Sequence, residues 1–378
     1  MKILFVTPYY KPYFGGIERV VEQLSREFID TYGCSTHILT SKWTFPRSYQ
    51  KKWLKTEIID RSEVYRLSSF PPIAPPFFQV PLVWFSPVEI KKYLERLQPD
   101  VIQLMSDRWF WVNYWIVTWA KQMNIPVVYS LSFHTLSHRQ QWLRPINNYI
   151  SSQSKKVQVI TQHERSLVNK TYGTNNDKIE VIPWGVIPQT FHQQRLSNSS
   201  PEVCIMSVGR ISDHKGQFWL AQRYQQATFE YNTHLLLIGA IEDQTVVDKI
   251  NALKHTGDKR ITITGEVTEN DLIQYYSLAD IFALFPEYEA FGLVFLEALQ
   301  SHVPVLTHNV GALREVLQHG SIVVDSFNAT QAIESLESLV NDPYKRKTLG
   351  NEGAKYVKET FTWEKTADRF MGMYTSLL

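Results

Sequence analysis

Two glutamates in an apolar stretch are the first residues whose types and spacing suggest chemistry. Glu289 and Glu297 stand on either side of Gly292 in PEYEAFGLVFLEAL, which follows the apolar segment ADIFALF. A helix that begins near Gly292 would place Glu289 in the preceding loop and Glu297 inside the helix. The free amide groups at that helix N-terminus can bind an anion. The two carboxylates could then accept hydrogen bonds from sugar or ribose hydroxyls beside it.

The same two carboxylates have other interpretations. Glu289 could only stabilise the positive end of the helix dipole, and Glu297 could be an exposed helical residue. A pair of carboxylates is also the catalytic apparatus of most glycosidases. We favour a binding pair for a phosphorylated sugar, because signals of phosphate binding accompany the two glutamates in the same half of the chain.

Two cations in SVGRISDHKG are the first of these signals. Arg210 and Lys215 follow an apolar, strand-like segment and stand beside Gly209, in a loop that leads into a helix. Cations at the end of a strand are suited to a diphosphate. A solvated loop with scattered charge is the alternative, and the glycine spacing of an ATP-binding P-loop is missing.

The first half of the chain adds a glycine pair and a histidine. Gly15 and Gly16 precede a helical pattern, so backbone amides near Gly16 could approach a phosphate or a sugar; a tight turn is the alternative. His134 ends the apolar segment PVVYSLSFH, where it could hydrogen-bond a sugar hydroxyl or be a structural residue. No cluster of His, Cys and Asp has metal-ligand spacing, and no Asp-x-Asp pair occurs, so no metal is expected.

Strand-like and helix-like segments alternate through both halves of the chain and predict the elements that position these residues. Apolar runs such as KILFV and DIFALF alternate with segments of helical spacing such as residues 15–33. This order is typical of parallel sheets built from right-handed βαβ units, in which ligands bind beyond the carboxyl ends of the strands. The polar stretch 192–202 separates the halves. The prediction is an α/β protein with two Rossmann-like, doubly wound domains, residues 1–193 and 194–358, which face a central cleft.

Composition and charge fit a folded protein with two dissimilar halves. The chain has 378 residues, of which 44% are hydrophobic and 20% are charged, and a formal net charge of +2. Residues 1–193 contain 23 Lys and Arg against 14 Asp and Glu, whereas the remainder contains 16 against 23. The basic half includes the aromatic segments 42–55 and 68–85, which could rest on an anionic membrane or form the wall of an acceptor pocket. No run is long enough to span a membrane, and no signal peptide is recognisable, so a cytoplasmic protein is expected.

In combination, these segments resemble the family 4 retaining glycosyltransferases over essentially the whole chain. GGIERVV resembles the N-terminal glycine loop of that family, SVGRISDHKG its VGR…KG segment, and EYEAFGLVFLEAL its E-x7-E motif, the most specific of the three. VPVLTHNVGALREV resembles the segment that follows, and FTWEKTADRFMGMYTSLL the helix that returns to the first domain. The resemblance implies the GT-B fold, with an acceptor-binding first domain, a donor-binding second domain and a returning helix over 359–378.

The resemblance also implies a role for each candidate residue. Arg210 and Lys215 would bind the donor diphosphate and stabilise the charge on the departing nucleoside diphosphate. Glu289 would contact the donor sugar, Glu297 the ribose, and His134 the donor sugar near the anomeric centre. The backbone positions expected around the donor are Gly16, Gly209, Gly265, Phe291, Gly292 and Leu293. The two cations would replace a metal ion, and no cofactor beyond the donor is implied.

The predicted activity is metal-independent, retaining transfer of a hexose-type sugar from a nucleoside-diphosphate sugar to a hydroxyl acceptor. The donor base (UDP, GDP or ADP) is left open, as is the acceptor: a glycolipid, a lipid-linked or polysaccharide precursor, or a small metabolite. Trp184 and Ile187 stand where the family commonly has Asn and Asp, which affects the acceptor side. A non-hydrolysing sugar-nucleotide epimerase and a non-catalytic sugar-nucleotide-binding subunit are the alternatives, and no nucleic acid partner is expected.

Overall fold

The computed structural model divides the chain into two compact units. It describes residues 1–12, 15–44, 48–50, 52–69, 85–131, 143–187, 202–253 and 260–378. Unit 1 contains Met1–Trp184 and Trp363–Leu378, and unit 2 contains Gly185–Thr362. Residues 185–187 and 359–362 therefore belong to unit 2, whereas the sequence boundaries placed them outside the donor domain. The predicted boundary between residues 193 and 194 lies outside the described residues.

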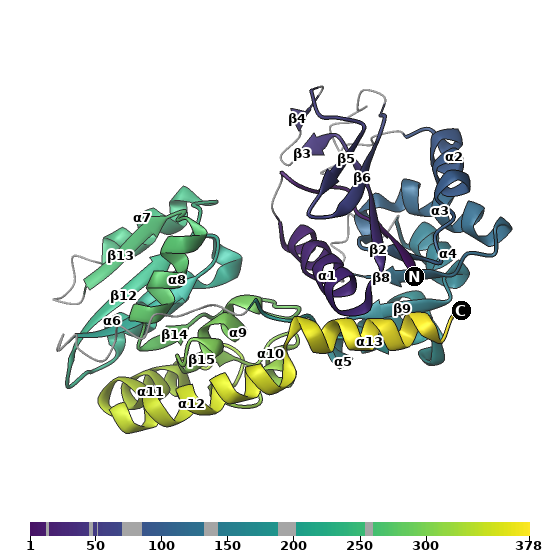
Figure 1. Ribbon diagram of the computed structural model, residues 1–378. Coiled ribbons are helices and arrows are strands. Elements are labelled where there is room, and N and C mark those ends of the chain that lie inside the picture. Colours follow the sequence, from purple (N-terminus) through teal and green to yellow (C-terminus); the bar gives the residue numbers. More distant parts are fainter. Residues whose placement is uncertain are drawn as a thin grey trace. The chain divides into compact units, whose positions relative to one another are not determined.

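Unit 1 is built on an eight-stranded sheet in the order β10-β9-β8-β7-β1-β2-β6-β5 (Figure 1). Its strands are β1 (Lys2–Val6), β2 (Ser35–Ser41), β5 (Thr56–Ile59), β6 (Ser62–Leu67), β7 (Val101–Leu104), β8 (Val127–Ser130), β9 (Lys156–Val159) and β10 (Ile179–Val181). Neighbouring strands pair in parallel, except that the edge strand β5 is antiparallel to β6. The short strands β3 (Trp43–Thr44) and β4 (Ser48–Tyr49) form a separate antiparallel pair.

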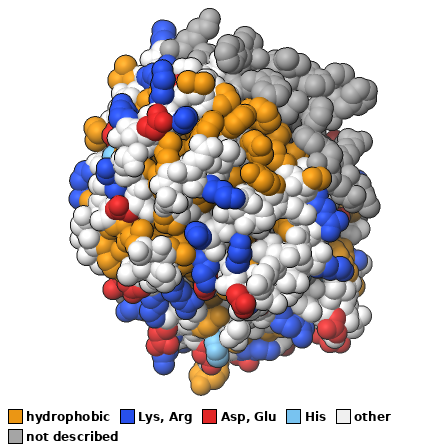
Figure 2. All heavy atoms as spheres, turned by 90° about the vertical axis from the view of Figure 1, so that its right-hand side faces the viewer, with side chains coloured by type: hydrophobic (Ala, Val, Ile, Leu, Met, Phe, Trp, Pro, Cys, Tyr) orange, Lys and Arg blue, Asp and Glu red, His pale blue; other side chains and the backbone are white. Residues whose placement is uncertain are grey.

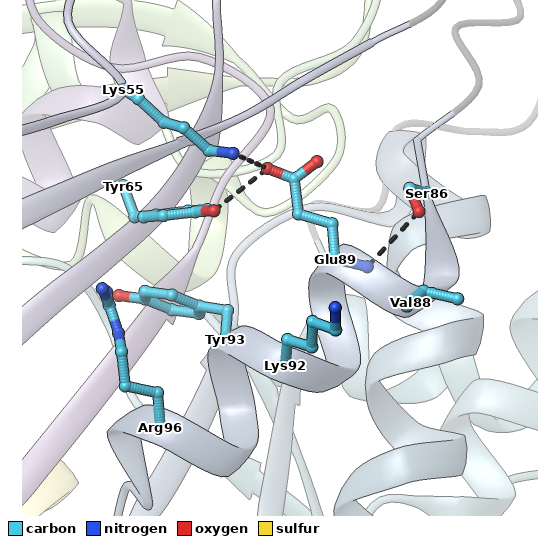
Figure 3. Close-up of a pocket in the computed structure, with 8 residues that line it drawn as sticks. All are labelled: Lys55, Tyr65, Ser86, Val88, Glu89, Lys92, Tyr93 and Arg96. Atoms are coloured by element: carbon cyan, nitrogen blue, oxygen red, sulfur yellow. Dashed lines mark hydrogen bonds and ion pairs between the residues drawn. The ribbon is translucent and has the colours of Figure 1, made fainter.

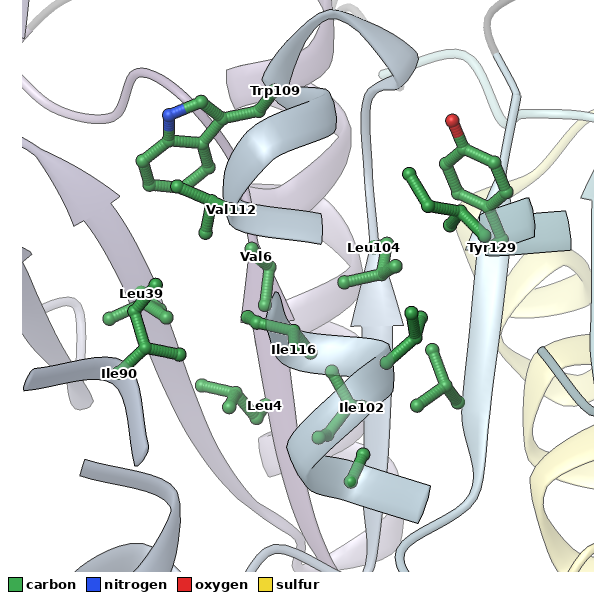
Figure 4. Packing of buried hydrophobic residues seen from close by; sticks show 14 of the residues in the cluster. Leu4, Val6, Leu39, Ile90, Ile102, Leu104, Trp109, Val112, Ile116 and Tyr129 are labelled. Carbon is green, nitrogen blue, oxygen red and sulfur yellow. The ribbon is translucent and has the colours of Figure 1, made fainter. Parts of the chain in front are cut away.

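Helices cover both faces of the unit 1 sheet. They are α1 (Gly16–Tyr32), α2 (Pro87–Leu97), α3 (Phe110–Gln122), α4 (Arg144–Gln153), α5 (Gln162–Tyr172) and α13 (Trp363–Thr375). On one face, Ile90 of α2 and Ile116 of α3 pack on Leu4, Leu39 and Ile102 of the sheet (Figure 4). On the other face, the rings of α1 and α13 contact the sheet and each other, and the hydroxyl of Tyr374 donates a hydrogen bond of 2.8 Å to Oε1 of Gln103 in β7.

Local signals explain where several of these helices begin and end. The apolar residues of α1 recur at helical spacing, and those that are buried include Val20, Leu24 and Phe28. Gly33 ends α1 in the left-handed conformation (φ 60°), as glycine does at many helix ends. The hydroxyls of Ser86 and Thr161 accept hydrogen bonds from the amides of the third residues of α2 and α5, which stabilises those N-termini.

Unit 2 is a six-stranded parallel sheet in the order β13-β12-β11-β14-β15-β16. The strands are β11 (Glu202–Val208), β12 (Asn232–Ile238), β13 (Arg260–Gly265), β14 (Ile281–Ala283), β15 (Val305–His308) and β16 (Ser321–Val324). The helices are α6 (Gln217–Gln226), α7 (Gln244–Leu253), α8 (Glu269–Leu278), α9 (Leu293–Gln300), α10 (Leu313–Val316), α11 (Ala329–Asn341) and α12 (Pro343–Thr360). Two doubly wound parallel sheets confirm the predicted α/β class. In unit 2 the strand order reverses between β11 and β14, and loops that follow strands at such a switch point form ligand sites.

Candidate functional site

The loops after β11 and β14 bring together two of the predicted site residues. Lys215 lies in the first loop and Glu289 in the second, and Nζ of Lys215 is 3.0 Å from Oε2 of Glu289. The two side chains are 22% and 17% exposed, so this ion pair is partly shielded but open to solvent. A cation and a carboxylate therefore meet at the switch point of the unit 2 sheet, where a ligand is expected.

Two glycines allow the loops of this site to approach one another closely. A Cβ atom on Gly216 would lie 1.9 Å from the carbonyl oxygen of Phe285, and one on Gly311 would lie 2.0 Å from the carbonyl oxygen of Glu289. Both glycines have positive φ, at 74° and 54°. The amide of Ala312 donates to that same Glu289 oxygen at 3.0 Å. The loop after β15 thus supports the backbone that carries Glu289.

The helix predicted to begin near Gly292 is α9. Gly292 precedes it with φ 85°, and a Cβ atom there would be 2.7 Å from the ring of Phe295. Phe291 and Phe295 are buried, whereas Leu293 is half-buried. The apolar residues therefore anchor the loop and the helix, and the carboxylates of the motif do not enter the hydrophobic core.

Glu297 is held by a buried tyrosine that was not among the predicted site residues. The hydroxyl of Tyr276 in α8 donates to Oε2 of Glu297 at 3.0 Å and lies 3.2 Å from the carbonyl oxygen of Val294. Burial, and then the Glu297 carboxylate, keeps the pKa of Tyr276 well above its ordinary value. Because Tyr276 stays protonated, it remains a hydrogen-bond donor to Glu297.

Arg210 pairs with a carboxylate from a third loop of unit 2. Its Nη1 atom is 2.7 Å from Oε1 of Glu242, and both side chains are largely exposed. Arg210 therefore pairs with the loop after β12, whereas Lys215 pairs with the loop after β14. The buried side chain of Gln217 donates from Nε2 to the carbonyl oxygens of Arg210 at 2.9 Å and Gly209 at 3.3 Å, which fixes the backbone of the first loop. Gln217 was not predicted, since its role depends on the folded shape of the loop.

His308 in β15 connects two loops near the site. Its Nε2–H donates to the carbonyl oxygen of Pro286 at 2.6 Å, and its Nδ1 accepts from the amide of Phe327 at 3.0 Å. These two bonds define a neutral ring with the proton on Nε2. Because Pro286 precedes the loop of Glu289, His308 is a second support for that loop.

A fall in pH is expected to weaken this support. Burial lowers the pKa of His308, so the unfolded chain, with a histidine pKa of about 6.5, takes up the proton more readily. The contribution of His308 to stability is therefore present above pH ~6.5 and is lost as the pH falls through the depressed pKa of the folded state. Denaturant unfolding at a series of pH values should show a shallower acid-side loss for His308→Gln than for wild type. An identical slope in both proteins would contradict this assignment.

The remaining predicted residues are divided between the two units. Gly265 ends β13 with φ 77°, and a Cβ atom there would have no neighbour within 4 Å. Gly16 opens α1 in unit 1 with equally free space. Near it, Glu18 is buried in the first turn of α1, and burial raises the pKa of its carboxyl to about 7. His134 lies outside the described residues, so its role stays a prediction.

Unit 1 contains a cation-rich pocket that the sequence did not predict (Figure 3). Its volume is about 420 Å³. The lining residues are Lys55, Tyr65, Ser86, Val88, Glu89, Lys92, Tyr93 and Arg96. The Glu89 carboxylate accepts from Nζ of Lys55 at 2.9 Å and from the hydroxyl of Tyr65 at 3.0 Å. Glu89 thus offsets the charge of Lys55, and Oε1 of Glu63 lies 3.2 Å from Nη2 of Arg96, so carboxylates offset two of the three lining cations.

Among the residues that the structure describes, no three His, Cys, Asp or Glu side chains come together in a way that could hold a metal ion. Nor does any described helix have the length and apolar character needed to cross a membrane.

Comparison with protein families identifies both parts of the chain. The model of "Glycosyltransferase Family 4" matches residues 14–190, and that of "Glycosyl transferases group 1" matches residues 188–356. The chain belongs to the family 4 glycosyltransferases. The order of the two models along this glycosyltransferase agrees with the motifs that the sequence shares with the family.

Known relatives of the glycosyltransferase cover different shares of its length. The capsular polysaccharide biosynthesis glycosyltransferase CapM of Staphylococcus aureus is 30% identical over 45% of each chain. An uncharacterized glycosyltransferase of Methanocaldococcus jannaschii is 23% identical over 99% of this chain and 98% of its own. The first alignment spans less than half of CapM, whereas the second spans nearly the whole of both proteins.

Solved structures confirm the GT-B fold. Sucrose-phosphate synthase from Thermosynechococcus elongatus has a TM-score of 0.78 at 20% identity, over 100% of this chain and 98% of that one. HepE from Anabaena, in complex with UDP-glucose, has a TM-score of 0.74 at 18% identity, over the whole of both chains. At 20% and 18% identity, these similarities show a shared fold alone.

Proposed function

We propose that this glycosyltransferase moves a hexose-type sugar, with retention of configuration, from a nucleoside-diphosphate sugar to a hydroxyl acceptor without a metal ion. The observation that carries the proposal is the 3.0 Å contact between Lys215 and Glu289 at the switch point of unit 2. A diphosphate would attract the ammonium of Lys215 away from Glu289, which frees the carboxylate to accept from the donor sugar. Until the donor binds, the ion pair would keep both side chains in place.

The surrounding groups would contact the rest of the donor. Amides at Phe291, Gly292 and Leu293 precede or open α9, where backbone N–H groups and the helix dipole favour phosphate. Glu297, fixed by Tyr276, would accept from the ribose diol. Arg210 would exchange Glu242 for phosphate, and Gly209 and Gly265 would leave room for the donor. For Gly16 and His134, contact with the donor stays a prediction from the family resemblance.

The proposed reaction breaks the bond between C1 of the sugar and the β-phosphate oxygen of the donor. The acceptor oxygen forms a new bond to C1 on the same face, and its proton passes to the departing phosphate oxygen. The positive charge of Lys215, together with that of Arg210, would stabilise the negative charge that develops on the nucleoside diphosphate. Relatives support the substrate class: HepE is described with UDP-glucose, and CapM with capsular polysaccharide biosynthesis.

A donor screen tests this proposal. We expect one of the UDP-, GDP- or ADP-sugars to raise the unfolding temperature, because a ligand at 100 times its Kd stabilises the folded state by about 2.7 kcal/mol. The same sugar nucleotide should be consumed only when an acceptor hydroxyl is present. The absence of a shift with every donor would contradict the proposal. An epimerised product from donor alone would instead identify an epimerase, and binding without turnover across a broad acceptor panel a non-catalytic subunit.

A further inference from the structure

Helix α3 of unit 1 is apolar on almost all sides although it lies in the outer layer of the unit. Its sequence, FWVNYWIVTWAKQ, contains no acidic residue and a single cation, Lys121. Val112, Ile116, Val117 and Ala120 are buried against the core. A helix that is apolar all round is normally enclosed by protein or by lipid. The outward side of α3 is therefore a candidate contact surface.

That outward side carries a ladder of aromatic rings. The side chains of Trp111, Tyr114, Trp115 and Trp119 are half-buried, and Tyr149 of α4 is 38% exposed. Ring centroids are 5.9 Å apart for Trp111 and Trp115, 5.8 Å for Trp115 and Trp119, and 5.2 Å for Tyr114 and Tyr149. We call these five residues the α3 aromatic surface. The Nε1 atoms of Trp111, Trp115 and Trp119 are buried, so the exposed parts of these rings are apolar. Tyrosine and tryptophan are enriched at the boundary between water and lipid.

Cations border the α3 aromatic surface. Nζ of Lys91 in the neighbouring helix α2 lies 4.9 Å from the ring centroid of Trp119. Lys92 and Arg96 of α2 are exposed and line the pocket of Figure 3, so α2 adds positive charge beyond Lys91. Figure 2 views the side on which α2, α3 and α4 lie in Figure 1, and it shows hydrophobic side chains gathered in patches with Lys and Arg beside them. Carboxylates lie beside two of these cations: Glu95 is 3.7 Å from Lys91, and Glu63 is 3.2 Å from Arg96.

We infer that the α3 aromatic surface binds an anionic lipid bilayer, with the rings at the level of the headgroups and the α2 cations against lipid phosphates. Aromatic rings bordered by Lys and Arg fit this boundary in both polarity and charge. A protein partner with an apolar groove would be complementary to the rings but would not require the surrounding cations. This inference goes beyond the proposed function, since it needs neither donor nor turnover.

Vesicle co-sedimentation of the full chain tests the inference. We expect binding to vesicles of phosphatidylcholine mixed with phosphatidylglycerol, little binding to phosphatidylcholine alone, and loss of binding as salt is raised. Lys91→Gln/Lys92→Gln should weaken binding roughly fivefold for each lysine removed. Lipids brominated near the headgroup should quench tryptophan fluorescence in the wild-type protein, since the rings would lie at that depth.

The aromatic contribution is tested with residues that do not support the core. Trp111→Ser/Tyr114→Ser changes two outward rings, whereas Trp115 and Trp119 also pack against the hydrophobic core of unit 1. The matched control is Tyr344→Ser/Lys347→Gln in α12 of unit 2, where Tyr344 is 78% exposed. Circular dichroism and thermal unfolding establish that each variant is folded.

We expect the aromatic variant to bind more weakly than wild type and the control to bind equally well. The inference is overturned if the wild-type protein does not bind anionic vesicles, or if it binds neutral ones as strongly. It is also overturned if a folded Trp111→Ser/Tyr114→Ser variant binds like wild type, because the membrane surface would then lie elsewhere. Concentration-dependent self-association that Trp111→Ser/Tyr114→Ser abolishes, without vesicle binding, would identify a protein interface instead.

Discussion

Replacement of Lys215 by alanine is expected to lower the rate of sugar transfer by about 10²–10³-fold. Removal of one group that stabilises developing negative charge typically has an effect of this size. The loss should come mainly from kcat, because the charge on the diphosphate grows as the bond to the sugar breaks. Steady-state kinetics with the donor found in the screen measure this effect.

Folding should be nearly unaffected in this variant, which separates the chemical effect from a structural one. The Lys215–Glu289 pair is partly exposed, so its loss is expected to change the free energy of unfolding by about 1 kcal/mol or less. Lys355→Ala is the matched control, because Lys355 is an exposed lysine of α12 in the same unit. Wild-type activity in a folded Lys215→Ala variant would refute the assignment of the site.

The second large effect is expected for Gly311→Ala. Alanine at this position has a positive φ and a Cβ atom 2.0 Å from the carbonyl oxygen of Glu289, so the backbone of Glu289 must move. We expect a loss of about 3 kcal/mol in the free energy of unfolding, from the left-handed conformation and the steric overlap together. Activity measured below the unfolding temperature should also fall by about 10²-fold, since a shift of this kind misplaces the catalytic groups.

Gly173→Ala is the control that separates backbone strain from close approach. Gly173 also has a positive φ of 61°, but a Cβ atom there would have no neighbour within 4 Å. It is therefore expected to lose only about 1 kcal/mol and to keep wild-type activity. Equal losses of stability in the two variants would show that the approach of Gly311 to Glu289 is unimportant.

The α/β class predicted from the sequence and the meeting of Lys215 with Glu289 have one physical reason in common. Lys215 and Glu289 both follow apolar strands, and the carboxyl ends of parallel strands lie at the same edge of a sheet. Their meeting therefore required only that β11 and β14 be neighbours, which the structure confirms.

The other contacts of the site join segments that are far apart in the sequence. The spacing of residues along the chain therefore could not predict them. Glu242 reaches Arg210 from the loop after β12, and Tyr276 reaches Glu297 from α8. His308 stands among apolar residues in β15, so no sequence pattern indicated its hydrogen bond to the carbonyl oxygen of Pro286. Helix α3 has apolar residues on almost all sides, so helical periodicity gave no indication of its outward surface.

The course of the chain between the units has a consequence for folding during synthesis. The chain leaves unit 1 after Trp184 and returns at Trp363, and Val186 and Thr362 are joined by a β-bridge within unit 2. Because α13 covers the sheet of unit 1 beside α1, that sheet keeps an uncovered apolar face until unit 2 has been translated. During synthesis, the N-terminal domain of a chain usually folds first. In this chain the unit that begins first is completed last, so the first half expressed alone would require residues 363–378 to be fused to it.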